Sequence, residues 1–174
     1  MTELQRLATE FNEAEDRIGL TAEILPGETV ILWLTRRLLT RLLPHLLGWL
    51  EQHPEIIGPA HLTSHASDMR QSFAQQVAAA QLLPLPPLEI GANSRRWLVN
   101  SVDVATTPQL IVLTFKGAEA DDSARLSLSA QKLRQWLTIV HGQCRLAQWS
   151  MEAWPRWVAD SALLRSEPAS MLVH

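Results

Sequence analysis

The predicted fold is decided by residues 17–50, which read RIGLTAEILPGETVILWLTRRLLTRLLPHLLGWL. The first eight residues of this stretch alternate polar and apolar side chains, as a half-buried strand does. A turn at Pro26-Gly27 and a second apolar run follow, which together predict an antiparallel hairpin. Thr35 then occupies a helix N-cap position, and leucines recur at helical spacing as far as Glu51. We therefore predict a hairpin that leads directly into an amphipathic helix packed on the sheet.

The pattern on either side of this stretch extends the prediction. Leucine, alanine and phenylalanine at helical spacing between Thr2 and Phe11 indicate a short opening helix. A second helix is predicted for residues 66–82, with Met69, Phe73, Val77 and Ala80 on its apolar side. Strands are then predicted near residues 96–105, 109–116 and 124–128. Ser129 caps a last helix that extends to Gln148.

These elements predict one α+β domain over residues 1–174, in the order α-β-β-α-α-β-β-β-α. Hairpins dominate, so we expect a largely antiparallel sheet of about five strands, covered by the helices that begin at Thr35 and Ser129. Each of these helices follows a strand directly. The similarity indicates either a duplicated strand–strand–helix unit or only a common type of capped junction.

The segment 82–88, LLPLPPL, is apolar and rich in proline. Proline cannot occupy a helix interior or a central strand, and a flexible linker would contain more glycine, serine and charge. We therefore predict an ordered, extended connection that lies along the core.

Composition narrows the classes of protein. The chain has 174 residues, a mass of 19.5 kDa, a formal net charge of -3 and a pI near 6.1. The acidic total disfavours nucleic-acid binding, although a local basic face would allow it. Charged residues and Pro44 interrupt the longest apolar stretch, which predicts no membrane span. The first 16 residues do not resemble a signal peptide, so we expect a cytoplasmic protein.

Motifs of common enzymes are absent. The sequence contains no Gly-x-Gly-x-x-Gly, no Walker loop and no Gly-x-Ser-x-Gly elbow. The single cysteine, Cys144, excludes intrachain disulfides and multi-thiolate metal sites. We predict no catalytic residue, no cofactor and no metal, and the question whether the protein is an enzyme stays open, with a non-catalytic role preferred.

Two clusters of titratable residues could contradict this prediction. His53, His61, His65 and Asp68 lie close in sequence and offer metal ligands, but solvated histidines near a helix start explain them better. Cys144 stands one helical turn after His141, as in a nucleophile–base pair. Because Cys144 continues an apolar stripe that His141 does not share, a buried structural thiol is the preferred interpretation.

Charged residues at three other places could form a site. Asp103 interrupts an apolar strand, and an outward-pointing side chain is the simplest explanation. The acidic stretch 119–122 lacks calcium-loop spacing and is interpreted as a solvated hairpin loop. Five arginines fall in two short stretches and could bind an acidic partner or phosphates: Arg36, Arg37, Arg41, Arg95 and Arg96.

The C-terminal region is rich in tryptophan. Three of the seven tryptophans lie in residues 149–157, and two of them, Trp154 and Trp157, flank Pro155 and Arg156. Because tryptophan is enriched at interface hot spots, residues 149–174 could dock another chain. The alternative is that this tail closes the protein's own core.

No family resemblance emerges, and we expect a non-catalytic accessory or adaptor protein of bacterial type. It would act through protein–protein contacts with a partner or with itself, for instance as a homodimer. The alternative is an enzyme or small-ligand-binding protein whose site uses Asp103 and the arginine cluster. Nucleic-acid binding through the arginine face is a weaker alternative.

Overall fold

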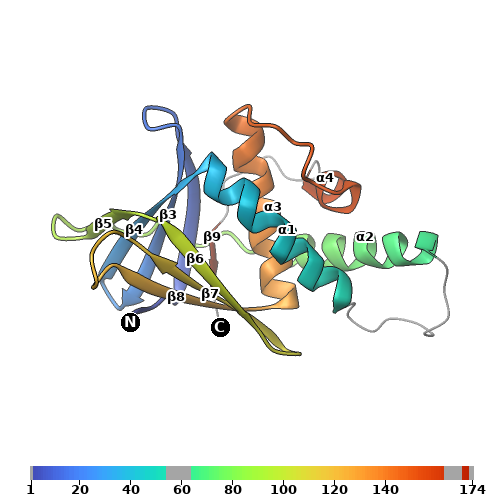
Figure 1. Cartoon of the computed structure of the whole chain (residues 1–174), viewed down its shortest axis with the longest axis horizontal. Helices are drawn as coiled ribbons and strands as arrows, with labels where there is room; N and C mark the ends of the chain where they lie inside the picture. The colour runs from blue at the N-terminus through green and yellow to red at the C-terminus, as the bar shows by residue number, and fades with distance from the viewer. Residues whose placement is uncertain (1, 54–63, 163–169, 173–174) are drawn as a thin grey trace.

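The computed structural model describes residues 2–53, 64–162 and 170–172 (Figure 1). Its helices are α1 (Arg36–Gln52), α2 (Ser64–Ala80), α3 (Ala130–Leu146) and α4 (Arg156–Ala162). Its strands are β1 (Thr2–Glu3), β2 (Arg6–Asn12), β3 (Arg17–Leu25), β4 (Glu28–Thr35), β5 (Arg95–Leu98), β6 (Ser101–Thr106), β7 (Leu110–Lys116), β8 (Ser123–Ser129) and β9 (Ser170–Leu172). The α+β class and the approximate order of elements are confirmed.

The strands form two sheets rather than one. One sheet has the order β1-β8-β7-β6 and the other β5-β4-β3-β2-β9. The five predicted strands are present and pair mostly antiparallel, as expected, but they are divided between two sheets that also contain strands the sequence did not predict. Most pairs are antiparallel, but β1–β8 and β4–β5 are parallel. Strands β1 and β9 were not predicted, because two or three residues show no reliable alternation, and the strand predicted near residues 96–105 is divided into β5 and β6.

The two halves of the chain repeat one topology. Strands β2-β3-β4 and β6-β7-β8 are antiparallel meanders, and each leads directly into a 17-residue helix, α1 or α3. In both, a hydroxyl at the N-cap accepts a bond from the backbone three residues on, at 3.2 Å for Thr35 and 3.3 Å for Ser129. The structure therefore favours a repeated unit over a common junction, and adds a third strand to it.

The first strands of the two units are exchanged. Strand β1 precedes the first meander but pairs with β8 of the second, and β5 precedes the second meander but pairs with β4 of the first. The backbone N–H groups of Leu4 and Val99 extend these ladders by donating to Arg125 and Trp33. Both Leu4 and Val99 are buried. The exchange joins the two sheets into one body with a continuous apolar core.

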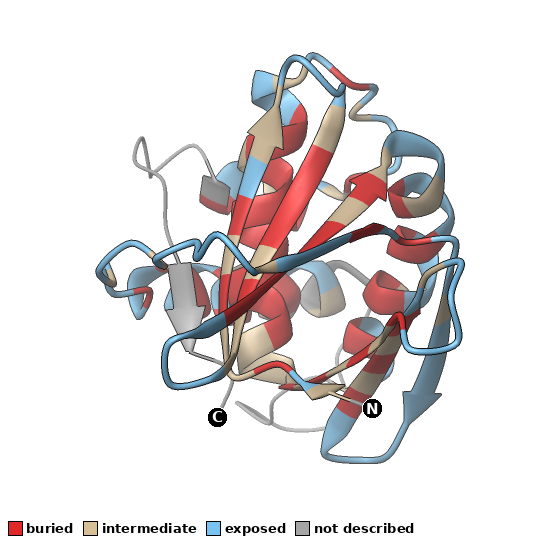
Figure 2. Ribbon diagram, turned by 90° about the vertical axis from the view of Figure 1, so that its left-hand side faces the viewer, coloured by how far each residue is buried: buried red, intermediate tan, exposed pale blue. Residues whose placement is uncertain are grey.

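Helices α1 and α3 pack on the sheets, as predicted. Helix α1 contacts β4 and β6, whereas α3 contacts β2 and β8. The leucines of α1 are buried except for the half-buried Leu38, and most of the residues of α3 are buried as well, its apolar ones in the common core. Figure 2 shows the buried residues concentrated in the central strands and in the helices behind them. Turns and the edge strand β6 are exposed.

The predicted opening helix is wrong, because residues 2–12 form β1 and β2. Leu7 and Thr9 are buried at strand spacing, and Trp136 Nε1 of α3 donates to Thr9 Oγ1 at 3.1 Å. Apolar residues three and four positions apart are compatible with a short helix or with a strand. Residues 6–12 form a strand because they pair with β3 and also with β9, and β9 lies far away in sequence.

The proline segment forms neither a helix nor a strand, as predicted, but it does not lie buried along the core. Leu82 is buried and Leu85 and Leu88 are half-buried, whereas its three prolines are exposed. Proline offers no backbone donor to a neighbouring strand, so the segment runs along the surface and leads into β5.

Candidate functional site

Helix α2 exposes an apolar strip, which we define as Met69, Phe73, Val77 and Ala80. The exposed fractions are 73% for Met69, 52% for Phe73 and 37% for Val77, and Ala80 is also exposed. These residues share one side of the helix because they recur every three or four positions. The four residues share one side of the helix, as the sequence pattern predicts, and in the structure this side faces outward.

The opposite side of α2 is polar and buried. Gln71 Nε2 donates to Leu50 O at 3.2 Å, and Gln75 Nε2 donates to Arg134 O at 2.9 Å and to Thr138 Oγ1 at 2.9 Å. Gln135 Nε2 of α3 donates back to Ala78 O at 3.1 Å. Burying these amides without partners would cost about 1–3 kcal/mol each, so the bonds fix the rotation of α2 about its axis.

Small side chains complete the buried side of α2. Ala74, Ala78 and Ala79 are buried where the helix meets α3 and α4. A larger side chain at these positions would hold the helices further apart, beyond the reach of the glutamine bonds. The signal in the sequence for the buried side of α2 was therefore the recurrence of alanines together with Gln71 and Gln75, four residues apart.

The tail tryptophans lie inside the protein. Trp154 and Trp157 are only 8% and 6% exposed. The Trp154 ring meets His141 edge-on at 5.0 Å, and the Trp157 ring lies 5.4 Å from the guanidinium carbon of the buried Arg134. Of the two alternatives for this region, the structure favours closure of the chain's own core. In this fold neither ring is presented to a partner.

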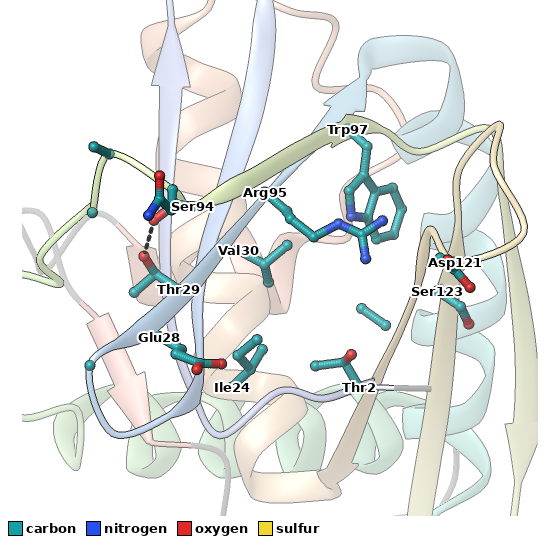
Figure 3. A pocket seen from close by; sticks show the side chains of 15 residues that line it. Thr2, Ile24, Glu28, Thr29, Val30, Ser94, Arg95, Trp97, Asp121 and Ser123 are labelled. Atoms are coloured by element: carbon teal, nitrogen blue, oxygen red, sulfur yellow. Dashed lines mark hydrogen bonds between the residues drawn. The ribbon is translucent and has the colours of Figure 1, made fainter.

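A cleft of about 560 Å³ opens between the two sheets (Figure 3). Strand β5, which lines it, lies at the end of the molecule opposite α2 (Figure 1). Its walls come from the β3–β4 turn, from the start of β5 and from the start of β8. Thr29 Oγ1 holds the approach to β5 in place, because it bonds Ser94 Oγ at 2.7 Å and donates to Glu89 O at 3.2 Å. Arg95 and Trp97 project from β5 into the space between the sheets (Figure 3).

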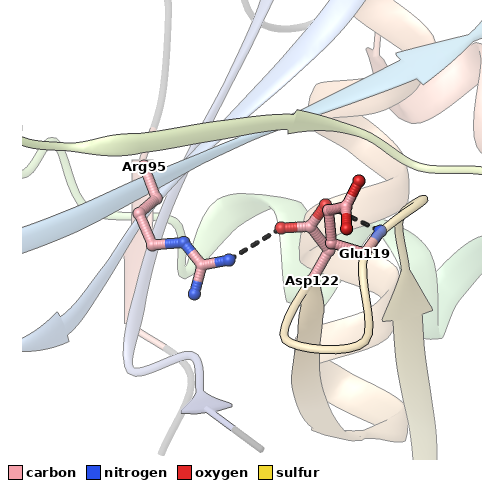
Figure 4. A network of polar contacts seen from close by, with 3 residues as sticks. All are labelled: Arg95, Glu119 and Asp122. Carbon is pink, nitrogen blue, oxygen red and sulfur yellow. Dashed lines mark hydrogen bonds and ion pairs between the residues drawn. The ribbon is translucent and has the colours of Figure 1, made fainter.

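An ion pair links the sheets beside this cleft. Arg95 of β5 donates to Asp122 Oδ1 at 2.8 Å, while Asp122 Oδ2 accepts from Glu119 N at 3.3 Å (Figure 4). Only glycine fits at position 117, where a Cβ would lie 2.5 Å from Asp122 Cβ and 2.9 Å from the Trp97 ring. Asp122 is therefore a buried structural residue, which corrects the interpretation of 119–122 as a wholly solvated loop.

The chemistry that this cleft offers is hydrogen bonding to a small polar molecule. Among the residues that the structure describes, its lining includes four hydroxyl side chains and the acids Glu28 and Asp121, but no histidine, cysteine or lysine. The guanidinium of Arg95 is already paired with an acid. The lining therefore holds no nucleophile–base pair of the Ser–His or Cys–His kind.

The five predicted arginines do not form one cluster. Arg36, Arg37 and Arg41 are exposed at the start of α1, which follows the end of β4. Arg95 and Arg96 are exposed in β5, where they pair with Val30 and Ile31 near the start of β4. The five residue-to-residue steps from Ile31 to Arg36 correspond to about 16 Å of strand. One ligand of phosphate size cannot reach both groups.

The other charged candidate, Asp103, points outward as interpreted. Its carboxylate pairs with Lys116 on the neighbouring strand β7, and both side chains are largely exposed. A cross-strand pair of this kind stabilises a hairpin modestly. It lies on the exposed strand β6 and does not line the cleft.

Cys144 is a buried thiol, as interpreted, and burial raises its pKa to about 12. His141, expected to lie off the apolar stripe, is also buried, because α4 covers that side of α3. Desolvation, with a smaller contribution from Arg145, lowers the pKa of His141 to about 4. A neutral thiol and a poor base are unsuited to nucleophilic catalysis at neutral pH.

Only part of the histidine cluster can be placed. His61 lies outside the described residues, and His65 lies in the first turn of α2. His53 stacks on Trp49 with ring centroids 4.6 Å apart, and its Nδ1 lies 2.8 Å from Trp49 O. Within the described residues, no three histidine, cysteine or acidic side chains come together as metal ligands.

None of the helices in the described part of the chain is long and apolar enough to cross a membrane. Comparison with protein-family models, with curated proteins and with solved structures gave no match. Inferences about function therefore rest on the residues and contacts of this chain alone.

Proposed function

We propose that this chain is a non-catalytic accessory or adaptor protein that acts through protein–protein contacts. In this proposal the α2 strip is its docking surface, and a second copy of the chain occupies it as a homodimer. The observation that carries the proposal is the orientation of α2, which is opposite to that of an ordinary surface helix. Its apolar side is exposed while its amides are bonded inside the protein.

Exposed apolar side chains are common singly, but here they are contiguous on one helix. Surface helices normally expose charged residues, and contiguous apolar patches mark interaction sites. No charged residue occurs between Gln71 and Leu88, so the outer side of α2 is neutral over most of its length. The strip therefore has the composition of an interface centre, where charged residues are depleted.

The same neutrality supports a second copy as the partner. In a two-fold dimer the same patch meets itself, so any charge in its centre would face a like charge. Around Phe73 and Val77 no charge opposes such self-pairing. Burial of three side chains on each copy gains roughly 1.5–3 kcal/mol per fully buried side chain, against an association cost of about 4–15 kcal/mol. We therefore expect a dimer that dissociates on dilution.

Small-ligand binding is a second candidate, and the cleft beside β5 supports it. A volume of about 560 Å³ is ordinary for a small-molecule site. Of the five predicted arginines only Arg95 lines it, and that side chain is paired with Asp122. The docking surface consequently has the stronger support.

Light scattering over a range of protein concentrations tests the proposed function. The wild-type chain is expected to approach twice its mass of 19.5 kDa as concentration rises. Phe73→Glu and Met69→Glu should each keep it at the mass of one chain, because in a dimer each would bury a negative charge in the interface between the two copies. Since both side chains are exposed, the melting temperatures of the two variants as monomers should be nearly unchanged.

The matched control is Leu146→Glu in the last turn of α3, outside the α2 strip. Leu146 is also large, apolar and exposed, so the same change in charge should leave the dimer intact. A wild-type chain that stays at 19.5 kDa at every concentration would overturn the second-copy proposal. So would a dimer that Leu146→Glu dissociates as well as Phe73→Glu does.

A further inference from the structure

The segment 82–90 shows burial that repeats every third residue. Leu82 is buried and Leu85 and Leu88 are half-buried, while every residue between them and after them is exposed. Leu83 and Ile90 are 70% and 51% exposed although both are large and apolar. Neither an α-helix nor a strand has this period, and the three-residue turn of a 3₁₀-helix requires backbone bonds that residues 83–90 do not donate. A polyproline II helix has this period, because it has three residues per turn.

The backbone of the segment agrees with this assignment. Leu82 N donates to Ala79 O at the end of α2, and the next turn begins where Ser94 N donates to Gly91 O. Between them, residues 83–90 donate no bond to another backbone group. Polyproline II makes no internal hydrogen bonds, and Pro84, Pro86 and Pro87 already have the required φ.

One ridge of this helix is attached to the protein and two are free. Leu82, Leu85 and Leu88 form the attached ridge. The free ridges contain two x-Pro dipeptides, Leu83-Pro84 and Pro86-Pro87, in which all four residues are exposed. Pro84 and Pro87 are three residues apart and lie on the same ridge, as in a Pro-x-x-Pro ligand. The protein thus covers only the spacer, Leu85, and presents both dipeptides together.

We propose that Leu83–Pro87 is a docking motif for a partner protein whose aromatic-lined groove binds polyproline II helices. Such grooves are lined by tryptophan and tyrosine rings that receive exposed prolines. Thr29 Oγ1, which donates to Glu89 O, fixes the far end of the segment on β4. The motif is ordered before binding, so association loses less conformational entropy than it would for a free peptide.

The charge of the residues around the motif indicates which charge the partner should carry beside its groove. The motif itself is neutral, and the first charged residue after it is the exposed acid Glu89. A groove with a cation beside the end that receives Glu89 is complementary, whereas an acidic flank at that end would repel it. This inference goes beyond the proposed dimer, because it concerns residues outside the α2 strip and a different partner.

The test uses a panel of purified, isotope-labelled SH3, WW and EVH1 domains as probes, titrated with the full-length chain and followed by NMR. At least one domain that has basic residues beside its groove is expected to show chemical-shift changes confined to the residues of its aromatic groove. The variant Pro84→Ala/Pro87→Ala should weaken that binding by about tenfold or more, equivalent to about 1.4 kcal/mol. Glu89→Lys should weaken it as well.

Pro108→Ala is the matched control, because Pro108 is an exposed proline in the β6–β7 turn. This variant should bind like the wild type, and the melting temperatures of all variants should confirm that they are folded. Absence of groove shifts throughout the panel at about millimolar concentration would overturn the proposal. Equal binding by the double variant and the wild type would overturn it too. Either result would leave the α2 dimer unaffected, since no variant here alters α2.

Discussion

Replacing Trp154 and Trp157 together by alanine is expected to unfold much of the protein. Both rings are buried against α3, where Trp154 meets His141 and Trp157 meets Arg134. Removing a buried aromatic ring costs about 3–5 kcal/mol, whereas a whole domain is stable by about 5–15 kcal/mol. Each single variant should lower the melting temperature by roughly 6–20 °C for a chain of this size.

Thermal melting followed by circular dichroism measures this effect. Met69→Ala is the control, because it truncates a large apolar side chain that is exposed, and it should shift the melting temperature little. If both single tryptophan variants melted within a few degrees of the wild type, these rings would not close the core. The tail would then have to be reconsidered as a docking segment.

Lowering the pH from 7 to 4 is expected to destabilise the fold through His141. Its pKa is about 4 in the folded protein, because burial disfavours the imidazolium and Arg145 adds to this effect. In the unfolded chain it returns to about 6.5. The unfolded state therefore binds the proton first, and stability present above pH 6.5 is lost as the pH falls through the folded pKa. The loss from this one group is roughly 3 kcal/mol.

Urea unfolding at several pH values tests this contribution. Carboxylates also titrate in acid, so the informative quantity is the difference between the wild type and His141→Phe. The free energy of unfolding of the variant should depend less steeply on pH between about 6.5 and 4, because phenylalanine takes up no proton. Parallel pH profiles for the two proteins would show that His141 does not contribute this sensitivity.

Local patterns predicted the fold where the partner elements are close in sequence. The β3–β4 hairpin, its turn at Pro26-Gly27 and the helix capped by Thr35 all follow from residues 17–50. The prediction failed for residues 2–11, because β2 pairs with β9 and β1 with β8, more than a hundred residues away. No local pattern encodes the exchange of β1 and β5 between the two units.

Only part of the candidate site could be predicted from the sequence. The apolar strip of α2 and its neutral surroundings can be read directly, but its direction depends on bonds from Gln71 and Gln75 to α1 and α3. Hydrophobicity alone places Phe73 inside. The same holds for the proline segment. Which of its residues are exposed depends on which leucines pack on the rest of the protein, and this three-residue period of burial is visible only in the structure.

Cross-linking through one introduced cysteine tests the central claim, that two copies meet on α2, most directly. Cys144 is buried with a raised pKa, so an added surface thiol is the reactive one. Gln76 lies beside the strip and is exposed, and Gln76→Cys leaves the strip intact. A short bismaleimide should join this variant into a species of two chains, and adding Phe73→Glu should abolish the product. Glu152→Cys, an exposed thiol elsewhere, should give little product. Equal yields from Gln76→Cys and Glu152→Cys, or no product from Gln76→Cys, would contradict docking on α2.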